Sequence, residues 1–516
     1  SQQNDLKSRI LQSFQMRAGQ CPVAAVSQQI IDLVLTFFAT THVVGKRLIL
    51  RVGLTLGRHE ARQRQNLVCV LLILHQTLFD DRPKLFPEIE IASLVIFLIG
   101  ITITGLPMGI AMIVSSIFYL AMSGRDVGLA AENVLNGVFG NFVALAVPLF
   151  IFAANIMNAG KVSDRLLNFA LALVGRVPGG MAQVNILTSL IFSGMSGSAI
   201  SDAAGVGKVV TGMMVKDGRY PPGFAGAITA TSAVIGPIFP PSIPMVFYAL
   251  ISSTSVGALF LGGVIPAIIL CTVLGGAVMI MAKMRGFPVE DAIPWRLFPL
   301  IVLRALPALF MPVILLGGIY SGAFTPTEAA AVSAFYALLL AGFAYRELSL
   351  KDFWDVVIST VRTTAVVTLV LCGAFIFNYV VTVERVPLAV FQMVTQMELT
   401  QVQFFLLLNV LYLILGCFLD VSTIMLVVTP LFLPAAAAQG IDLTHLGVVL
   451  VFNMMIGLIT PPYGILLFII KALNGIPLRD MIREVWIFLA LLIAILMLLT
   501  FVPELVLWLP RAAGMM

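Results

Sequence analysis

The sequence predicts an all-α integral membrane protein, a polytopic bundle of helices with inverted repeats and two re-entrant hairpins of opposite orientation. Three observations lead to this prediction. Of the 516 residues, 60% are hydrophobic and only 11% are charged, and the mean hydropathy is +1.05. Apolar windows of about 20 residues, long enough to cross a bilayer as a helix, recur after residue 90. The chain also contains an internal repeat, which is described below.

Roughly a dozen full or half windows follow residue 90. The preceding region is different, because residues 1–90 hold 11 Lys/Arg and 7 Asp/Glu, whereas residues 91–516 hold 19 and 18. We expect a basic N-terminal extension of unclear structure, with one or two membrane-associated helices or little order, and no cleavable signal peptide. The expected domains are the extension 1–87 and a membrane-spanning domain 88–510, with repeats at about 90–282 and 298–510.

Several function classes find no support in the sequence. The five cysteines form no CxxC pair, and the four histidines are scattered singly, so there is no zinc-site spacing. The sequence has no Walker A, HExxH or GxSxG motif. We therefore expect neither an enzyme nor an ATP-driven pump, no organic cofactor, and no nucleic-acid partner.

The loops carry positive charge unevenly, which orients the chain. Lys and Arg cluster in loops 283–304, 346–362 and 471–483, whereas loops 321–327 and 437–446 contain none. Positively charged loops stay in the cytoplasm. In a bacterial inner membrane, the loops without Lys or Arg therefore face the periplasm.

Two segments then have both flanks on one side of the membrane. Segment 177–207 has basic flanks, so it is predicted to enter and leave from the cytoplasm. Segment 403–436 has periplasmic neighbours, so it is predicted to enter and leave from outside. Charge alone thus predicts the two re-entrant hairpins.

The chain repeats itself at an offset of 221 residues. This offset places the pattern G-x-I-x-P-P at 236–241 on the same pattern at 457–462, and Ser201 on Ser422. Each pattern follows, by about forty residues, a small and polar break in an apolar run. This combination is typical of inverted-repeat secondary transporters, whose site lies at broken helices near the membrane midplane.

The two Pro-Pro pairs are expected to free backbone carbonyls four residues earlier, since proline has no N–H. Freed carbonyls and Ser/Thr hydroxyls can bind a desolvated hard cation such as sodium, and we predict about two sites. The predicted ligands are Ser193, Ser196, Ser198, Gly236, Pro237 and Ser242 for one site, and Asp420, Ser422, Thr423, Gly457, Leu458 and Thr460 for the other. Kinks and small-residue packing are the alternative explanation.

Asp420 is an acid inside an otherwise apolar hairpin, which makes it a functional candidate. Its alternative role is that of a buried partner for a nearby Asn or Lys. Arg385 lies at the outer end of a span, where a long basic side chain ordinarily reaches the interface. The predicted substrate-binding residues are Ser198, Pro241, Arg385, Asp420 and Pro462.

Four separated segments resemble the large (M) subunit of TRAP (tripartite ATP-independent periplasmic) transporters. They are 192–199, 236–244, 317–329 and 457–464, and the resemblance covers about residues 88–510. It implies sodium-coupled uptake of an organic acid, such as a C4-dicarboxylate, sialic acid or another sugar acid, by an elevator motion.

The resemblance also implies two partners, a periplasmic substrate-binding protein and a small four-span (Q) membrane subunit. In some members the small subunit is fused at the N-terminus, but residues 1–85 are too short and too charged to form four spans. Two alternatives remain. One is a channel or a sodium/carboxylate symporter without a binding protein. The other, a membrane enzyme, is disfavoured because the sequence offers no nucleophile–base pair or metal cluster.

Overall fold

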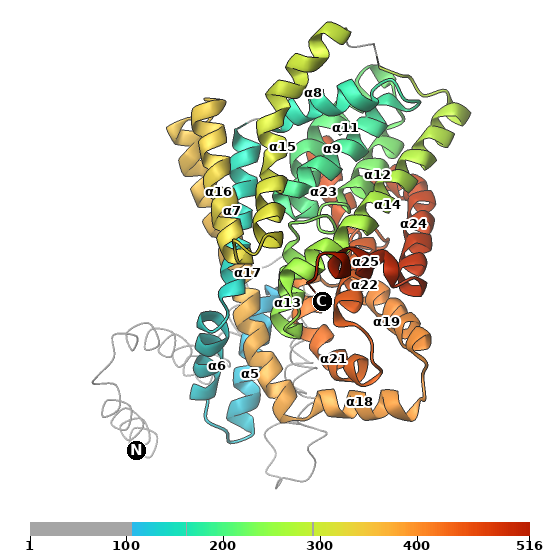
Figure 1. The fold of residues 1–516 in the computed structure, drawn as a ribbon. Coiled ribbons are helices and arrows are strands. Elements are labelled where there is room, and N and C mark those ends of the chain that lie inside the picture. Colours follow the sequence, from blue (N-terminus) through green and yellow to red (C-terminus); the bar gives the residue numbers. More distant parts are fainter. Residues whose placement is uncertain (1–105, 161, 291–293, 516) are drawn as a thin grey trace, which may run out of the picture. The chain divides into compact units, whose positions relative to one another are not determined.

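The computed structural model describes residues 106–515, except 161 and 291–293. Within these residues every regular element is a helix, which confirms the predicted all-α class (Figure 1). The predicted N-terminal extension 1–87 lies outside the described residues.

Seven described helical segments are long and apolar enough to cross a membrane, and six shorter apolar helices have 10–17 residues. Together they agree with the dozen or so windows expected from the sequence. The seven are Phe142–Ala159, Val256–Arg285, Phe298–Tyr320, Pro326–Ala344, Leu350–Val383, Val421–Ala438 and Leu478–Phe501.

The first half of the described chain contains ten α-helices and a π-helical turn, η2. They are α5 (Met108–Met122), α6 (Gly128–Phe139), α7 (Ala146–Ala159), α8 (Val162–Val174), α9 (Gly180–Ser196), α10 (Ala199–Asp202), η2 (Ala203–Gly207), α11 (Lys208–Val215), α12 (Pro222–Ala233), α13 (Ile243–Ser252) and α14 (Val256–Arg285).

The second half continues with eleven α-helices and two further π-helical turns, η5 and η6. They are α15 (Phe298–Tyr320), α16 (Pro326–Leu339), η5 (Leu340–Ala344), α17 (Leu350–Val383), α18 (Val386–Gln396), α19 (Gln401–Gly416), α20 (Val421–Thr423), η6 (Ile424–Val428), α21 (Thr429–Ala438), α22 (Leu443–Gly457), α23 (Ile465–Asn474), α24 (Leu478–Phe501) and α25 (Glu504–Ala512).

The order of elements repeats at the offset found in the sequence. Adding 221 to the bounds of η2 gives the bounds of η6. The same addition takes the start of α9 to the start of α19, and the start of α12 to the start of α22. The sequence repeat is therefore a structural repeat, while the exact repeat bounds and the orientation of the hairpins in the membrane stay predictions.

Several helix starts are fixed by local capping. Thr400 accepts from the backbone N–H of Gln403 while the Gln403 side chain accepts from Thr400, which forms a capping box at α19. Ser349 and Asp352 form the same motif at α17. Each box satisfies backbone donors that the first helical turn leaves without partners. In an apolar chain these few polar residues therefore determine where helices begin.

The helices fall into two groups, shown together in Figure 1. We call α5, α6, α7, α15, α16 and α17 the framework helices; within them α5 packs on α17 and α7 packs on α16. A Cβ atom on Gly109 would come 2.7 Å from the Leu369 backbone, so glycine permits the close α5–α17 contact. Small residues of this kind let membrane helices approach closely.

The second group, the hairpin helices, comprises α9 to α14 and α19 to α25. Within it α12 packs on α24, and α19 packs on α22. Two connecting helices join the groups, because α8 leads from α7 to α9 and α18 leads from α17 to α19. The two breaks predicted from sequence lie in the second group, after α9 and after α19.

Candidate functional site

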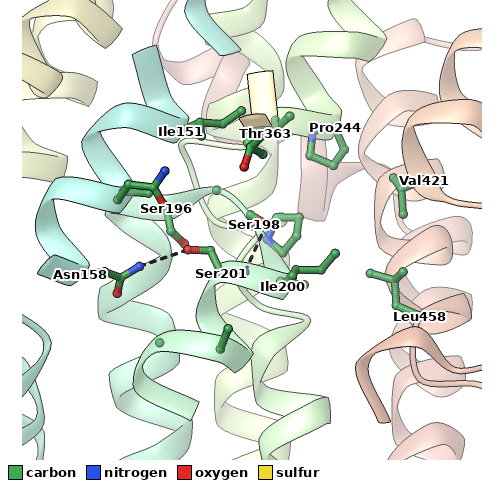
Figure 2. A pocket seen from close by; sticks show the side chains of 18 of the residues that line it. Ile151, Asn158, Ser196, Ser198, Ile200, Ser201, Pro244, Thr363, Val421 and Leu458 are labelled. Atoms are coloured by element: carbon green, nitrogen blue, oxygen red, sulfur yellow. Dashed lines mark hydrogen bonds between the residues drawn. The ribbon is translucent and has the colours of Figure 1, made fainter. Parts of the chain in front are cut away.

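A cavity of about 700 Å³ lies where the two breaks meet. Pockets that bind small molecules commonly have volumes of about 300–1,000 Å³. Six of the predicted site residues line it: Ser196, Ser198, Pro237, Asp420, Ser422 and Leu458. Figure 2 shows Ser196, Ser198 and Ser201 on one side of this cavity and Val421 and Leu458 on the other. Segments about 220 residues apart in the sequence therefore converge on one site.

The first break is a left-handed turn followed by a capped helix. Gly197 ends α9 with φ +60°, a conformation that glycine adopts without a steric penalty. Ser198 then begins α10, and its Oγ accepts a hydrogen bond from the Ser201 N–H at 3.4 Å. We call residues 196–202 the first tip.

The first tip packs directly on the first Pro-Pro loop. The Gly197 carbonyl accepts from the Ile243 N–H at 3.4 Å, and a Cβ on Gly197 would lie 2.6 Å from the Pro241 carbonyl oxygen. A Cβ on Gly236 would lie 3.4 Å from Ser198. The G-x-I-x-P-P motif therefore packs against the first break. This contact explains why the motif and the break occur at a fixed spacing in the sequence.

The second break, residues 417–423, carries a carboxylate at its helix start; we call it the second tip. Asp420 caps α20, since its Oδ2 accepts from the Thr423 N–H at 3.1 Å and its Oδ1 accepts from the Thr423 hydroxyl. A carboxylate has room for further partners, and Asp420 is half-buried at the cavity. The Asn or Lys partner of the alternative interpretation is not among its described contacts.

The expectation of free carbonyls needs correction at three positions, Pro237, Gly457 and Leu458. The Pro237 carbonyl accepts from the Ser242 hydroxyl, the Gly457 carbonyl from the Thr460 N–H at 3.2 Å, and the Leu458 carbonyl from the Leu466 N–H at 3.1 Å. The bonds to Pro237 and Leu458 form because the chain folds back after each Pro-Pro pair, whereas the bond to Gly457 closes a turn before the second pair. A carbonyl oxygen has two lone pairs, so cation binding by these groups stays a prediction.

Nine predicted residues do not line the cavity: Ser193, Gly236, Pro241, Ser242, Arg385, Thr423, Gly457, Thr460 and Pro462. Two of their hydroxyls bond to a carbonyl three or four residues earlier, since Ser193 donates to the Leu190 carbonyl at 2.5 Å and Thr460 donates to the Ile456 carbonyl at 2.7 Å. This is the usual local bonding of Ser and Thr.

The framework helices contribute polar residues that the sequence reading missed. Asn155 and Asn158 of α7 line the cavity, as does Thr363 of α17. Asn158 Nδ2 donates to Ser201 Oγ at 3.4 Å, the contact drawn in Figure 2. The spacing of Asn155 and Asn158 could have identified them in the sequence, because residues three apart on a helix share one face.

Asp202, at the end of the first tip, was also missed. It is fully buried, and neither carboxylate oxygen has a hydrogen-bond partner among the described residues. The Ser196 hydroxyl is likewise buried without a partner, and Ser189 lies beside Asp202. An unpaired buried charge is strongly unfavourable, so these oxygens fit a site for a hard cation. The rule that selected Asp420 applies equally to Asp202, which is an acid in an apolar hairpin.

Comparison with known proteins identifies the family of the chain. Residues 95–505 match the family described as "Tripartite ATP-independent periplasmic transporter, DctM component". The sialic acid TRAP transporter large permease protein SiaM of Vibrio cholerae is 40% identical over 418 residues, which cover 80% of this chain and 96% of the relative.

A second relative is the C4-dicarboxylate TRAP transporter large permease protein DctM of Pseudomonas aeruginosa. It is 39% identical over 375 residues, covering 73% of this chain and 88% of the relative. Among solved structures, the Alcanivorax borkumensis YdaH transporter is similar in fold alone, with a TM-score of 0.52, 14% identity, and coverage of 71% of this chain and 86% of that one. The chain therefore belongs to the DctM component family of tripartite ATP-independent periplasmic transporters, and is a multi-pass membrane transport protein, not an enzyme.

Proposed function

We propose that the chain is the carrier subunit of a sodium-coupled system that takes up an organic acid across the bacterial inner membrane. The observation that carries the proposal is the convergence of both tips on one cavity. The first tip holds the buried, unpaired carboxylate of Asp202, and the second holds the carboxylate of Asp420, which caps α20. Two of the relatives are named for sialic acid and for C4-dicarboxylates, both of which are organic acids.

The two tips supply the two cation sites. At the first, Asp202 and the Ser196 hydroxyl offer oxygens that no described donor satisfies. At the second, Asp420 and Ser422 face the cavity beside Leu458. Hard cations prefer carboxylate, carbonyl and hydroxyl oxygens, and sodium moves here as a co-transported ion.

The substrate occupies the cavity between these cations. The described residues that line it include no Lys, Arg or His, so the charge of a carboxylate is balanced by the sodium ions. Asn155, Asn158 and Thr363 provide amide and hydroxyl groups that bind the neutral polar groups of the substrate. This lining suits an acid that also bears hydroxyl groups.

A tripartite system needs two further components. A periplasmic binding protein delivers the acid, and a small four-span membrane subunit completes the membrane part. In inverted-repeat carriers, one helix group moves against the other so that the site opens alternately to each side. The framework and hairpin helices are the two groups available for such a motion.

The test is uptake of radiolabelled sialic acid and succinate into proteoliposomes that contain this chain with its small subunit and binding protein. We expect concentrative uptake that requires an inward sodium gradient and no ATP. Undiminished concentrative uptake with potassium or choline in place of sodium, without a proton gradient, contradicts the proposal. Counterflow separates a carrier from a channel, and omission of the binding protein tests the symporter alternative.

A further inference from the structure

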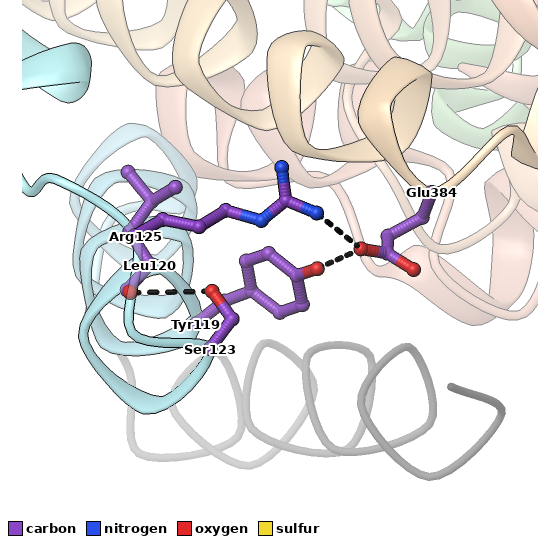
Figure 3. A network of polar contacts seen from close by, with 5 residues as sticks. All are labelled: Tyr119, Leu120, Ser123, Arg125 and Glu384. Carbon is purple, nitrogen blue, oxygen red and sulfur yellow. Dashed lines mark hydrogen bonds and ion pairs between the residues drawn. The ribbon is translucent and has the colours of Figure 1, made fainter. Parts of the chain in front are cut away.

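Two clusters of charged and aromatic side chains lie outside the cavity, where the connecting helices begin. The first, the α18 corner, consists of Glu384, Tyr119 and Arg125 (Figure 3). The Tyr119 hydroxyl donates to Glu384 Oε1, and Arg125 Nη2 lies 3.6 Å from the same oxygen. Glu384 is the C-cap residue of α17, two positions before α18, and its side chain is only 10% exposed. The corner therefore ties the α17–α18 junction to the end of α5.

The second cluster, the α8 corner, consists of Arg165, Tyr345 and Glu347. Arg165 Nη2 lies 2.9 Å from Glu347 Oε1, and the guanidinium group stacks over the Tyr345 ring at 3.6 Å from its centre. The Tyr345 hydroxyl donates to the Arg304 carbonyl of α15 at 2.9 Å. Arg165 belongs to the first turns of α8. This corner ties α8 to α15 and to the segment that follows α16 and η5.

The two corners are counterparts in the internal repeat. Subtracting 221 from Glu384 gives position 163, two residues from Arg165, and adding 221 to Arg125 gives position 346, next to Glu347. The charges are exchanged, because the carboxylate of Glu384 precedes α18 at one corner, whereas the guanidinium of Arg165 lies in the first turns of α8 at the other. Each corner also joins one repeat to the other repeat. A single surface ion pair is usually of little consequence, but this recurrence at related positions calls for a common cause.

The backbone is bent at both corners. Arg385, which follows Glu384, has φ +56°, and Arg346, which precedes Glu347, has φ +54°. Left-handed backbone is unfavourable for residues other than glycine, and it persists where surrounding contacts hold it. Hinges in proteins are a few loop or element-terminal residues that absorb large changes of φ and ψ.

Each corner is also linked by nearby contacts to the cavity or to the π-helical turn that follows a tip. Next to Arg165, Ser163 and Asp164 line the cavity, and Ser163 Oγ donates to Asn158 Oδ1 at 3.5 Å. Near the α18 corner, Asn378 of α17 donates to the Leu426 carbonyl of η6 at 2.9 Å. The connecting helices themselves pack on hairpin helices, α8 on α9 and α18 on α21. A displacement at a corner is therefore transmitted to the cavity over a short path.

We propose that Glu384 with Tyr119 and Arg125, and Arg165 with Tyr345 and Glu347, are positioning residues of the transport cycle. The corners hold the starts of α18 and α8 against the framework helices and so set the two pivots about which the hairpin helices move. The inference rests on the proposed carrier function. It adds to that function by assigning the fixed points of the motion to two charge-exchanged, repeat-related ion pairs.

The test measures uptake against substrate concentration for Arg165→Gln and Glu384→Gln. At saturating substrate, we expect the rate of each variant to fall roughly fivefold, which equals about 1 kcal/mol in the barrier. The concentration for half-maximal uptake and the thermal unfolding temperature should match the parent, since neither residue lines the cavity. The charge-exchanged double variant Arg165→Glu with Glu347→Arg should recover most of the rate.

Arg285→Gln is the matched control. Its ion pair with Glu484, at 2.8 Å, joins α14 to α24 within the hairpin helices, so its loss leaves both pivots intact. Arg125→Gln and Glu347→Gln repeat the test from the other partner, in case one variant fails to insert. Parent-like rates in the Gln variants overturn the proposal, as does a rate loss that the Arg285→Gln control shares or that follows thermal stability.

A separate measurement distinguishes failure of this inference from failure of the proposed function. If the parent shows no sodium-driven uptake, the carrier proposal fails, and hydrogen exchange of the detergent-solubilised protein then tests the corners alone. Arg165→Gln should speed exchange in 162–174, and Glu384→Gln in 386–396, while Arg285→Gln changes neither. Unchanged exchange in both segments overturns the assignment of the pivots.

Discussion

The two tips share a backbone plan but differ in electrostatics. Both follow a long helix, begin a short capped helix, and continue into a π-helical turn. At the first tip a serine caps the helix, and the acid, Asp202, is fully buried without a partner. At the second tip the acid, Asp420, is the cap itself and is half-buried. The repeat has preserved the architecture while the chemistry has diverged, so the two cation sites should not be equivalent.

The largest effect is expected for Asp202→Asn, which keeps the shape and removes the charge. A charge-assisted interaction is worth about 1.5–3 kcal/mol, and burial strengthens it, so apparent sodium affinity should fall about 100-fold. Sodium titration of uptake measures the change. Asp355→Asn, at an exposed acid of α17, is the control. A sodium dependence like that of the parent would show that the buried carboxylate at the first tip binds no cation.

A smaller effect is expected for Asp420→Asn. Asparagine is also a good N-cap, so the start of α20 should persist and membrane insertion should be normal. Because two of the lone pairs of Asp420 already accept from Thr423, we expect a fall in sodium affinity of about tenfold. The same titration measures it. If Asp420→Asn transports like the parent at limiting sodium, the acid of the second tip acts only as a cap.

The smallest effect on transport is expected for the glycines that begin the two G-x-I-x-P-P motifs, where the change is one of stability. A Cβ on Gly457 would lie 2.7 Å from the Gly416 backbone, whereas the nearest atom to a Cβ on Gly236 is 3.1 Å away. Gly457→Ala should lower the free energy of unfolding by about 1–3 kcal/mol, and Gly236→Ala by less. Thermal unfolding in detergent checks the order, with Gly317→Ala, which meets no neighbour within 4 Å, as control. Equal losses would mean that the two repeats pack alike.

The sequence predicted the helical class, the repeat offset and the position of both breaks, because these depend on local patterns. Runs of apolar residues, Pro-Pro pairs and small polar breaks determine their own neighbourhood. The G-x-I-x-P-P motif at 236–241 then identified the loop that packs on the first tip. Six predicted residues reach the cavity for this reason.

Other features depend on three-dimensional placement. The hydrogen bond from Asn158 to Ser201 joins residues 43 positions apart, and the bond that the Leu458 carbonyl accepts depends on how the chain returns after Pro462. The sequence gives Arg385 no position relative to the cavity, and the structure leaves it outside the lining. Asp202 is different, because an acid in an apolar hairpin is a local sequence pattern. The hydroxyls of the neighbouring serines were predicted as ligands in its place.

The π-helical turns η2 and η6 have a consequence for helical phase. A π-helical turn holds one residue more than an α-helical turn, so side chains before and after it are shifted by about 100° around the helix axis. Such turns occur often at functional sites. The shift lets the polar residues of each tip face the cavity while the apolar residues of α11 and α21 keep contact with their neighbours. The two halves therefore share the rotation of the side chains around the helix axis at each tip. A single residue inserted into or deleted from either turn would change this rotation.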